Sequence, residues 1–230
     1  MLEIIVTSVQ DAIEAERGGA SRLEVVRELD RGGLTPSLPL VRDILTAVRI
    51  PVRAMIRESD GYGVAGMPER NLLRRAAAAM DALGIDGMVL GFVRGRSPDI
   101  ETTMDILSAA PRLSVTFHHA FDDLEDPINA LATLKACGRL DWVLTHAAGA
   151  DWTARAARLS MLATAASPEI AVMVGGGVDT ATIAELGRRA AVAAFHVGRA
   201  ARVPPVPDGH VSAAKVRALA AVLRAQAMRA

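Results

Sequence analysis

Short runs of β-branched and other apolar residues alternate along the chain with longer stretches in which Ala, Leu and Arg recur at a helical period. The runs predict strands at residues 2–7, 22–26, 52–56, 87–90, from 114 onward, 141–144, 170–174 and 193–197. The longer stretches predict helices at 9–17, from a cap at Ser37 to 48, 68–83, 100–109, 127–136, 153–166, after a cap at Asp179 or Thr180, and 212–227.

Eight strand–helix units predict an α/β fold, a single-domain TIM (β/α)8 barrel with parallel strands over residues 1–230. Parallel strands need crossover helices, and a closed barrel buries both faces of its sheet. An open doubly wound sheet is the alternative. A glycine fingerprint after the first strand would favour that alternative, and residues 7–11 contain no glycine.

Charge, lysine and cysteine content exclude several classes of function. The 26 basic and 26 acidic residues give a net charge of zero, which argues against nucleic acid and anionic membranes as partners. Lys135 and Lys215 lie outside the expected strands, which argues against a Schiff-base aldolase. The single cysteine, Cys137, excludes an intrachain disulfide. With no signal-peptide or membrane-span pattern, we expect a cytoplasmic protein.

Polar residues gather at the carboxyl ends of the expected strands, where a barrel of this kind places its active site. They are Glu24, Arg27, Arg57, His118, His119, Asp122, Thr145, His146, His196 and Arg199. Glu24 and His118 are candidates for an acid–base or metal-binding pair, and Asp122 and the buried Glu3 are further catalytic candidates. A Glu–Arg network that locks the strand register is the alternative role for the two glutamates.

The loops after the seventh and eighth strands are candidates for an anion site, because barrels often bind phosphate there. Glycines would let backbone N–H groups approach an oxyanion, and an arginine would supply charge. A tight turn that requires positive φ is the alternative reading of the glycines. The ligand-binding candidates are Arg57, Thr145, Gly176, Gly177, His196, Gly198 and Arg199.

The fifth strand ends in two consecutive histidines, His118 and His119. Adjacent residues of a strand face opposite ways, so the two are not expected to bind one ion together. If Thr116 and His118 face inward, His119 turns towards the helices or the loop above. We therefore expect Glu24, rather than His119, to be the functional partner of His118.

Several motifs, in order over nearly the whole chain, resemble the copper homeostasis protein CutC family. They are Leu2-Glu3-Ile4, Arg22-Leu23-Glu24, the GGLTPS stretch at 32–37, Met55-Ile56-Arg57, the VTFH stretch at 115–118 with AFD at 120–122, Leu144-Thr145, the turn at 175–178 and His196. The resemblance implies a cytoplasmic TIM barrel, often oligomeric, that is associated by name with copper tolerance. It implies no defined catalytic activity.

The chain departs from the family pattern at the family's cysteines. Relatives commonly carry cysteine after the first-strand Leu-Glu-Ile and after the second-strand Glu, where this chain has Ile5, Val6 and Val26. The departure argues against a thiolate Cu(I) site. His119 stands where the family has Arg, and His146 stands where it has Ser.

Three functions stay open. The first is binding or conversion of a small anionic or phosphorylated molecule through Glu24, His118, Arg57 and His196. The second is copper-ion binding or trafficking through histidines, and the third is a metal-assisted lyase or isomerase. The candidate cofactor is copper or another divalent metal, with His118 and His196 as candidate ligands. The apolar, Ala-rich helices favour a homo-oligomer, and we expect a dimer.

Overall fold

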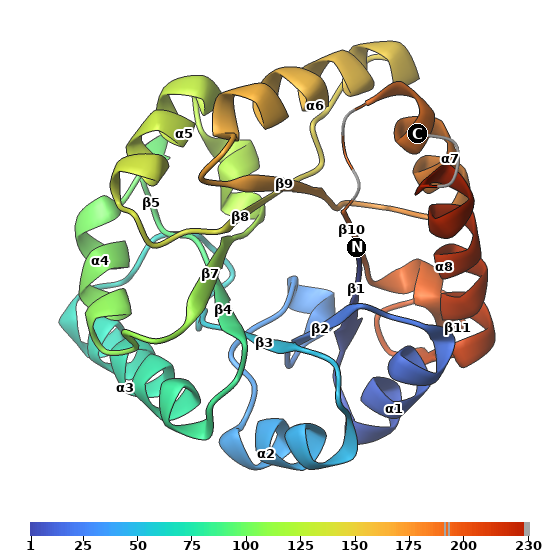
Figure 1. Ribbon diagram of the computed structural model, residues 1–230. Coiled ribbons are helices and arrows are strands. Elements are labelled where there is room, and N and C mark those ends of the chain that lie inside the picture. The colour runs from blue at the N-terminus through green and yellow to red at the C-terminus, as the bar shows by residue number, and fades with distance from the viewer. Residues whose placement is uncertain (191, 193, 228–230) are drawn as a thin grey trace.

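The computed structural model describes residues 1–190, 192 and 194–227, which form a closed barrel of eight parallel strands. Neighbouring strands are hydrogen-bonded in the order β1-β10-β9-β8-β7-β4-β3-β2, and the ring closes between β2 and β1 (Figure 1). The barrel strands are Leu2–Val6 (β1), Arg22–Val25 (β2), Val52–Met55 (β3), Gly87–Leu90 (β4), Ser114–Phe117 (β7), Trp142–Thr145 (β8), Ala171–Val174 (β9) and Phe195–Val197 (β10). The predicted TIM barrel is confirmed.

Helices surround the strands as an outer ring (Figure 1). They are Val9–Gly18 (α1), Leu38–Ala47 (α2), Met67–Leu83 (α3), Ile100–Ser108 (α4), Pro127–Ala136 (α5), Trp152–Ala166 (α6), Thr180–Arg189 (α7) and Ala213–Ala227 (α8). The predicted boundaries agree within two residues, and residue 193 of the expected eighth strand lies outside the described residues. Ser37 and Asp179 cap their helices as expected, each accepting a hydrogen bond from a first-turn backbone N–H.

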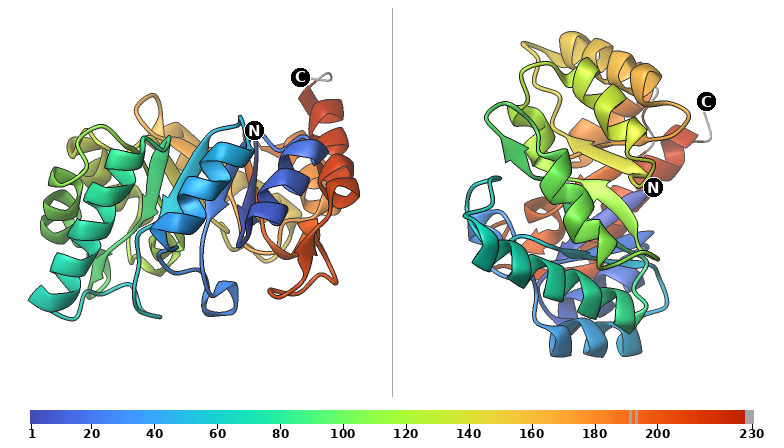
Figure 2. Two further views of the ribbon diagram at one scale, coloured as in Figure 1. Left: turned by 90° about the horizontal axis from the view of Figure 1, so that it is seen from below. Right: turned by 90° about the vertical axis from the view of Figure 1, so that its left-hand side faces the viewer.

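Short elements that the sequence pattern did not predict decorate the loops. Two antiparallel hairpins pair Val93–Arg94 (β5) with Ser97–Pro98 (β6) and Arg202–Val203 (β11) with His210–Val211 (β12). Three 3-10 turns cover Leu29–Arg31 (η1), His119–Asp123 (η2) and Arg199–Ala201 (η3). In the left view of Figure 2 the loop after β2 and the β11–β12 hairpin extend at the lower end, opposite the N-terminus. This end of the barrel is its carboxyl-terminal mouth.

Strand alternation separates two kinds of core. Leu23 and Val25 of β2 belong to the large apolar core between strands and helices, whereas Glu24, between them, faces the interior of the barrel. Smaller apolar clusters, one built on Met55 and one on Met173, fill part of that interior. The remaining interior positions are polar, so the barrel must satisfy buried charge as well as exclude water.

Ion pairs neutralise the buried arginines in the lower interior of the barrel. Arg22 on β2 donates from Nε to Oε2 of Glu3 on β1 at 2.5 Å. Arg53 on β3 donates to Asp86 at 3.0 Å and makes two hydrogen bonds to Asp141. Glu3 thus has the arginine partner that the alternative of a Glu–Arg network requires, while Arg53 pairs with aspartates outside that network.

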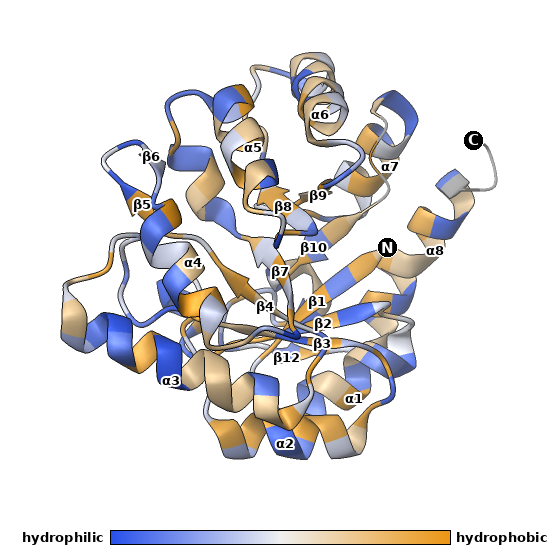
Figure 3. Ribbon diagram, turned by 60° about the vertical axis from the view of Figure 1, so that its left-hand side comes forward, coloured by the Kyte–Doolittle hydropathy of each residue, from blue (hydrophilic) through white to orange (hydrophobic). Residues whose placement is uncertain are grey.

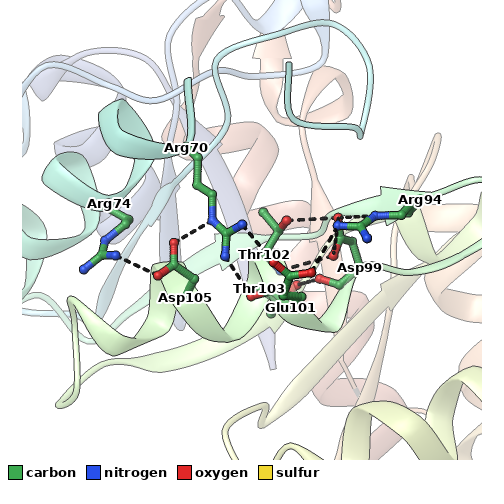
Figure 4. A network of polar contacts seen from close by, with 8 residues as sticks. All are labelled: Arg70, Arg74, Arg94, Asp99, Glu101, Thr102, Thr103 and Asp105. Carbon is green, nitrogen blue, oxygen red and sulfur yellow. Dashed lines mark hydrogen bonds and ion pairs between the residues drawn. The ribbon is translucent and has the colours of Figure 1, made fainter. Parts of the chain in front are cut away.

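A surface network joins α3 and α4 on the outside of the barrel (Figure 4). Arg70 of α3 donates to Asp105 at 2.6 Å and to Glu101 at 3.1 Å, both on α4. Arg94 of β5 pairs with Asp99, the N-cap of α4. The contacts hold the β5–β6 hairpin against the ring of helices.

Apolar and polar residues alternate along the outer helices, as the orange and blue segments of α2 and α3 show (Figure 3). Within the described part of the chain, no helix is both long enough and apolar enough to cross a bilayer.

Asp11 on α1 connects the first strand–helix unit of the barrel to the β11–β12 hairpin, which follows the last barrel strand. Its carboxylate accepts hydrogen bonds from Arg202 at 3.1 Å, from the backbone of Val211 at 2.9 Å and from Thr7. Asp11→Ala leaves the buried Arg202 guanidinium without its counter-charge, so we expect a loss of about 3–5 kcal/mol of unfolding free energy, measured by chemical denaturation. The exposed Arg17→Ala on the same helix is the matched control, and an equal effect of both variants would contradict this role.

Candidate functional site

A cavity of about 790 Å³ opens at the mouth of the barrel. Eight of the residues predicted from the sequence line it: Glu24, Arg57, His118, Gly176, Gly177, His196, Gly198 and Arg199. Three others do not line it: Glu3 lies in the interior below, and Asp122 and Thr145 lie behind the cavity wall. These eight residues come from strands β2 and β10 and from the loops that follow β3, β7, β9 and β10.

A chain of buried charges lies at the base of the cavity. Glu3 is held by Arg22 and also contacts His196, whose Nδ1 lies 2.8 Å from Oε1 of Glu3. The other ring nitrogen of His196, Nε2, lies 3.4 Å from Oε2 of Glu24. The second oxygen of Glu24, Oε1, is buried and has no hydrogen-bond partner among the described residues. Glu24 is thus the end of the chain that faces the cavity.

The surroundings move the pKa values of the two glutamates in opposite directions. Burial opposes the charge of Glu3, but the hydrogen bond to His196 and the charge of Arg22 lower its pKa to about 2. Burial raises the pKa of Glu24 to about 7, and the negative charge of Glu3 adds to that shift. Burial opposes the charge of His196 as well, and both glutamates overcome it to raise its pKa. Glu24 can therefore gain or lose a proton near neutral pH.

His118 is a neutral hydrogen-bond donor to the cavity. Its Nδ1 accepts the backbone N–H of Ala120 at 3.2 Å, which places the ring proton on Nε2. Nε2 is buried and has no partner in the described part of the chain. Burial, together with the charge of Arg57, lowers the pKa of the imidazole to about 3. Gly91 makes room for the ring, since a Cβ there would lie 2.7 Å from Nδ1.

Arg57 lines the cavity, yet most of its donors hold the mouth loops together. Nη1 donates to the carbonyl oxygen of Gly33 at 3.3 Å, and Nε donates to that of Gly61 at 3.4 Å. The guanidinium also lies 5.1 Å from the ring centroid of Tyr62, whose ring stands 5.0 Å from that of His118. Arg57 therefore fixes the loops and the Tyr62 ring against His118 in addition to carrying charge.

The rim opposite Arg57 combines glycines with an exposed arginine. Gly176 and Gly177 have φ values of 73° and 74°, so the stretch has the positive φ that the tight-turn alternative requires, and both glycines also line the cavity. A Cβ at Gly176 would also approach the Cβ of His146 to 2.8 Å. Arg199 begins η3 on the other rim loop and is exposed. The backbone of Gly176 and Gly177 and the guanidinium of Arg199 therefore line the same side of the cavity.

Asp122 is the centre of a second cluster of polar side chains, which includes His119, Thr145 and His146. Its Oδ2 lies 2.8 Å from Nδ1 of His119 and 2.6 Å from Nδ1 of His146, and its Oδ1 accepts from Thr145 at 2.5 Å. Burial opposes ionisation, but the hydrogen bonds from His119 and Thr145 lower the pKa of Asp122 to about 2. The η2 turn returns the His119 ring to the cavity wall, so the expectation that strand alternation directs it away is wrong.

Sequence comparison identifies the family to which this site belongs. A family model for the CutC family matches residues 1–201. The chain belongs to the CutC family. The human copper homeostasis protein cutC homolog is 32% identical over 197 residues, which cover 85% of this chain and 72% of that protein. A CutC family protein of Xanthomonas axonopodis pv. citri is 34% identical over 211 residues, or 91% of this chain and 88% of that one.

Structure comparison agrees with the CutC assignment. The crystal structure of a putative copper homeostasis protein CutC from Streptococcus agalactiae matches with a TM-score of 0.78 at 25% identity, covering 86% of this chain and 98% of that one. Thiamine phosphate pyrophosphorylase from Pyrococcus furiosus matches with a TM-score of 0.62 at 14% identity, covering 98% of this chain and 96% of that one. The second likeness shows the barrel fold alone.

In this CutC-family barrel the sequence missed two residues of the site. Tyr62 lies in the glycine-rich loop after β3, and its being the single tyrosine of the chain was a signal that could have singled it out. Gly91 follows β4, and only the packed His118 ring shows why a glycine stands there. Glu24 and His118 do not bond to each other; both line the same cavity, and each has one buried polar atom without a partner among the described residues.

The Glu24 carboxyl predicts a pH dependence for this CutC-family chain. Its pKa is raised from 4.5 to about 7, so between those values the folded state binds the proton more tightly than the unfolded chain. Its contribution to stability is complete below pH 4.5 and falls as pH rises to about 7. Glu24→Gln removes the titration, so the wild-type unfolding free energy minus that of the variant should fall across this window. Denaturant titrations at several pH values measure it, and a difference that rises with pH would be the contrary result.

Proposed function

We propose that this CutC-family barrel binds a small anionic molecule at its mouth and moves a proton on that molecule. One observation carries the proposal. Glu24 Oε1 and His118 Nε2 are buried polar atoms without partners among the described residues, and both residues line the same cavity. A buried polar group without a partner costs free energy, so a bound molecule that pairs with both would recover it.

Glu24 is the proton-transferring group of the proposal. A pKa of about 7 lets a carboxyl act as a base in one half of a reaction and as an acid in the other. Its second oxygen lies near His196, and Glu3 holds His196 from the far side. Glu3 and His196 are therefore positioning residues, which set the orientation and the pKa of Glu24.

His118 supplies a neutral N–H donor. Because its pKa is lowered to about 3, the imidazole stays uncharged over the physiological range. A neutral donor can hydrogen-bond an oxygen on which negative charge develops without acidifying Glu24 by its own charge. Together the two groups are suited to removing a proton next to a carbonyl or to moving one between oxygens.

The rim supplies recognition of negative charge. Gly176 and Gly177 allow an oxyanion to approach the backbone, and the exposed Arg199 offers a guanidinium on the neighbouring loop. These loops follow β9 and β10, the seventh and eighth barrel strands, where barrels of this class often bind phosphate. A small phosphorylated or carboxylated molecule fits this combination.

A role in copper binding is suggested by the names of the relatives, which are called copper homeostasis proteins. Cu(I) is held best by thiolate and thioether ligands. Cys137, the single cysteine of the chain, follows α5 and donates to the carbonyl oxygen of Thr133 at 3.4 Å, and burial raises the pKa of its thiol. The proposal therefore assigns no thiolate copper site to this chain.

A thermal-shift comparison tests ligand binding. Inorganic phosphate and a panel of small phosphorylated and carboxylated compounds are compared with neutral analogues of the same size. Anions should raise the melting temperature of the wild type, and Arg199→Ala should weaken binding by about tenfold through loss of one charged contact. Arg49→Ala, which changes an exposed arginine before β3 at the other end of the barrel, is the matched control. Equal shifts from neutral and anionic compounds would refute anion recognition.

Proton transfer is tested on the compounds that bind. In D2O, nuclear magnetic resonance should show wild-type protein exchanging an activated C–H hydrogen of the ligand for deuterium. Glu24→Gln should slow this exchange by about 10²–10⁴-fold, because the amide cannot accept the proton. Binding without exchange in the wild type would leave a binding protein and remove the catalytic part of the proposal.

A further inference from the structure

Three metal-ligating side chains converge at the cavity wall, which one of them, His119, helps to line, and none of them belongs to the Glu24–His118 pair. His119 begins η2, Asp122 lies one turn later, and His146 follows β8. Each offers one ligand atom, and the three atoms lie within 4.8 Å of one another. Side-chain exposures of 32% for His119 and 45% for His146 leave the group open to solvent. A small ion can therefore reach it from the mouth.

Hydrogen bonding within the group is crowded. Oδ2 of Asp122 lies within hydrogen-bond distance of Nδ1 of His119, Nδ1 of His146 and the backbone N–H of His146 at 3.1 Å. The first and third of these nitrogens make hydrogen bonds to Oδ2, and Nδ1 of His146 lies against the same oxygen as a further close contact, so three nitrogens crowd one oxygen that offers about two lone pairs. A cation among the three ligand atoms relieves the crowding, because each imidazole then turns a lone pair, rather than a proton, towards the centre.

We propose that His119, Asp122 and His146 form a binding site for a divalent first-row transition metal, with Zn²⁺ as the reference ion. Two imidazole nitrogens and one carboxylate oxygen are a donor set that binds such ions and leaves a position open for water or a ligand. Zn²⁺ bonds of about 2.0–2.2 Å place tetrahedral ligand atoms about 3.4 Å apart. The present separations of 2.8 and 2.6 Å from Asp122 need to open by less than an ångström.

The surroundings hold the ligands in place. Thr145 donates to Oδ1 of Asp122 and accepts the backbone N–H of Ala147 at 2.9 Å, which fixes the carboxylate while Oδ2 faces the histidines. Arg155 donates to the carbonyl oxygen of His146 at 2.9 Å. A Cβ at Gly175 would approach Nε2 of His119 to 2.8 Å, so the glycine leaves space for that ring. Supporting contacts of this kind orient the ligands of metal sites.

The site is distinct from the pair that the proposed function uses. His196 is engaged by Glu3 and Glu24, and Nδ1 of His118 is engaged by the Ala120 backbone, so neither belongs to the group. His118 and His196, the candidate metal ligands named from the sequence, stand apart from the group of His119, Asp122 and His146. The metal site does not depend on proton transfer by Glu24, and either proposal can fail without the other.

Zinc titration of the chelator-treated full chain tests the site. Competition with a chromophoric chelator should give one Zn²⁺ per wild-type chain. His119→Ala and His146→Ala should each weaken binding by about 100-fold or more, and Thr145→Val by about tenfold to 100-fold, because it supports a ligand without being one. His146→Gln serves as a second variant if His146→Ala fails to fold, since Gln keeps a polar side chain and removes the ring nitrogens.

Two variants serve as controls for this titration. His210→Ala removes an exposed histidine of β12, far along the chain from the group, and should leave zinc affinity unchanged. Glu24→Gln should also keep the zinc site, which separates this result from the test of the proposed function. No stoichiometric zinc binding, or binding that survives both His119→Ala and His146→Ala in folded protein, would overturn the proposal.

Discussion

The burial of two glutamates on neighbouring strands is the constraint on which the mouth of this barrel depends. Glu3 and Glu24 cannot both be charged inside a low-dielectric interior without matching cations. Arg22 and His196 both contact Glu3, whereas the one ion-pair contact of Glu24 among the described residues is with the far nitrogen of His196 at 3.4 Å. Because the cationic partners lie closer to Glu3 than to Glu24, the pKa of Glu3 is lowered and this residue stays ionised. Burial raises the pKa of Glu24, which can therefore take up a proton near neutral pH.

Around the cavity, too, some polar residues are engaged in structural contacts while others keep an atom without a partner. Arg57 uses its donors on loop carbonyls and on the Tyr62 ring, so it fixes the walls, while His118 keeps a free N–H towards the cavity. His119 and His146 both contact one carboxylate, that of Asp122. The mouth of this CutC-family barrel thus holds two separate polar groups, one built on Glu24 and one on Asp122.

Periodicity predicted the fold because each strand and helix is defined by local alternation. The eight β-branched runs and the capped helices could be read directly, and the closed barrel followed from their number and order. The parts that escaped prediction have few local signals: two-residue hairpins, 3-10 turns, and Gly91, which only the packed His118 ring explains. Strand alternation also misled for His119, because the chain leaves the strand at that residue and turns back.

Strand order alone was enough to place several side chains at the mouth, since carboxyl ends of parallel strands lie at one end of a barrel. Glu24, His118 and His196 were placed there by counting strands. Tertiary structure alone decided which of them touch: it joined Glu3 to His196, separated Glu24 from His118, and drew Asp122 to two histidines. The reason is physical, because charge pairing and pKa depend on distances of a few ångströms between residues far apart in the chain.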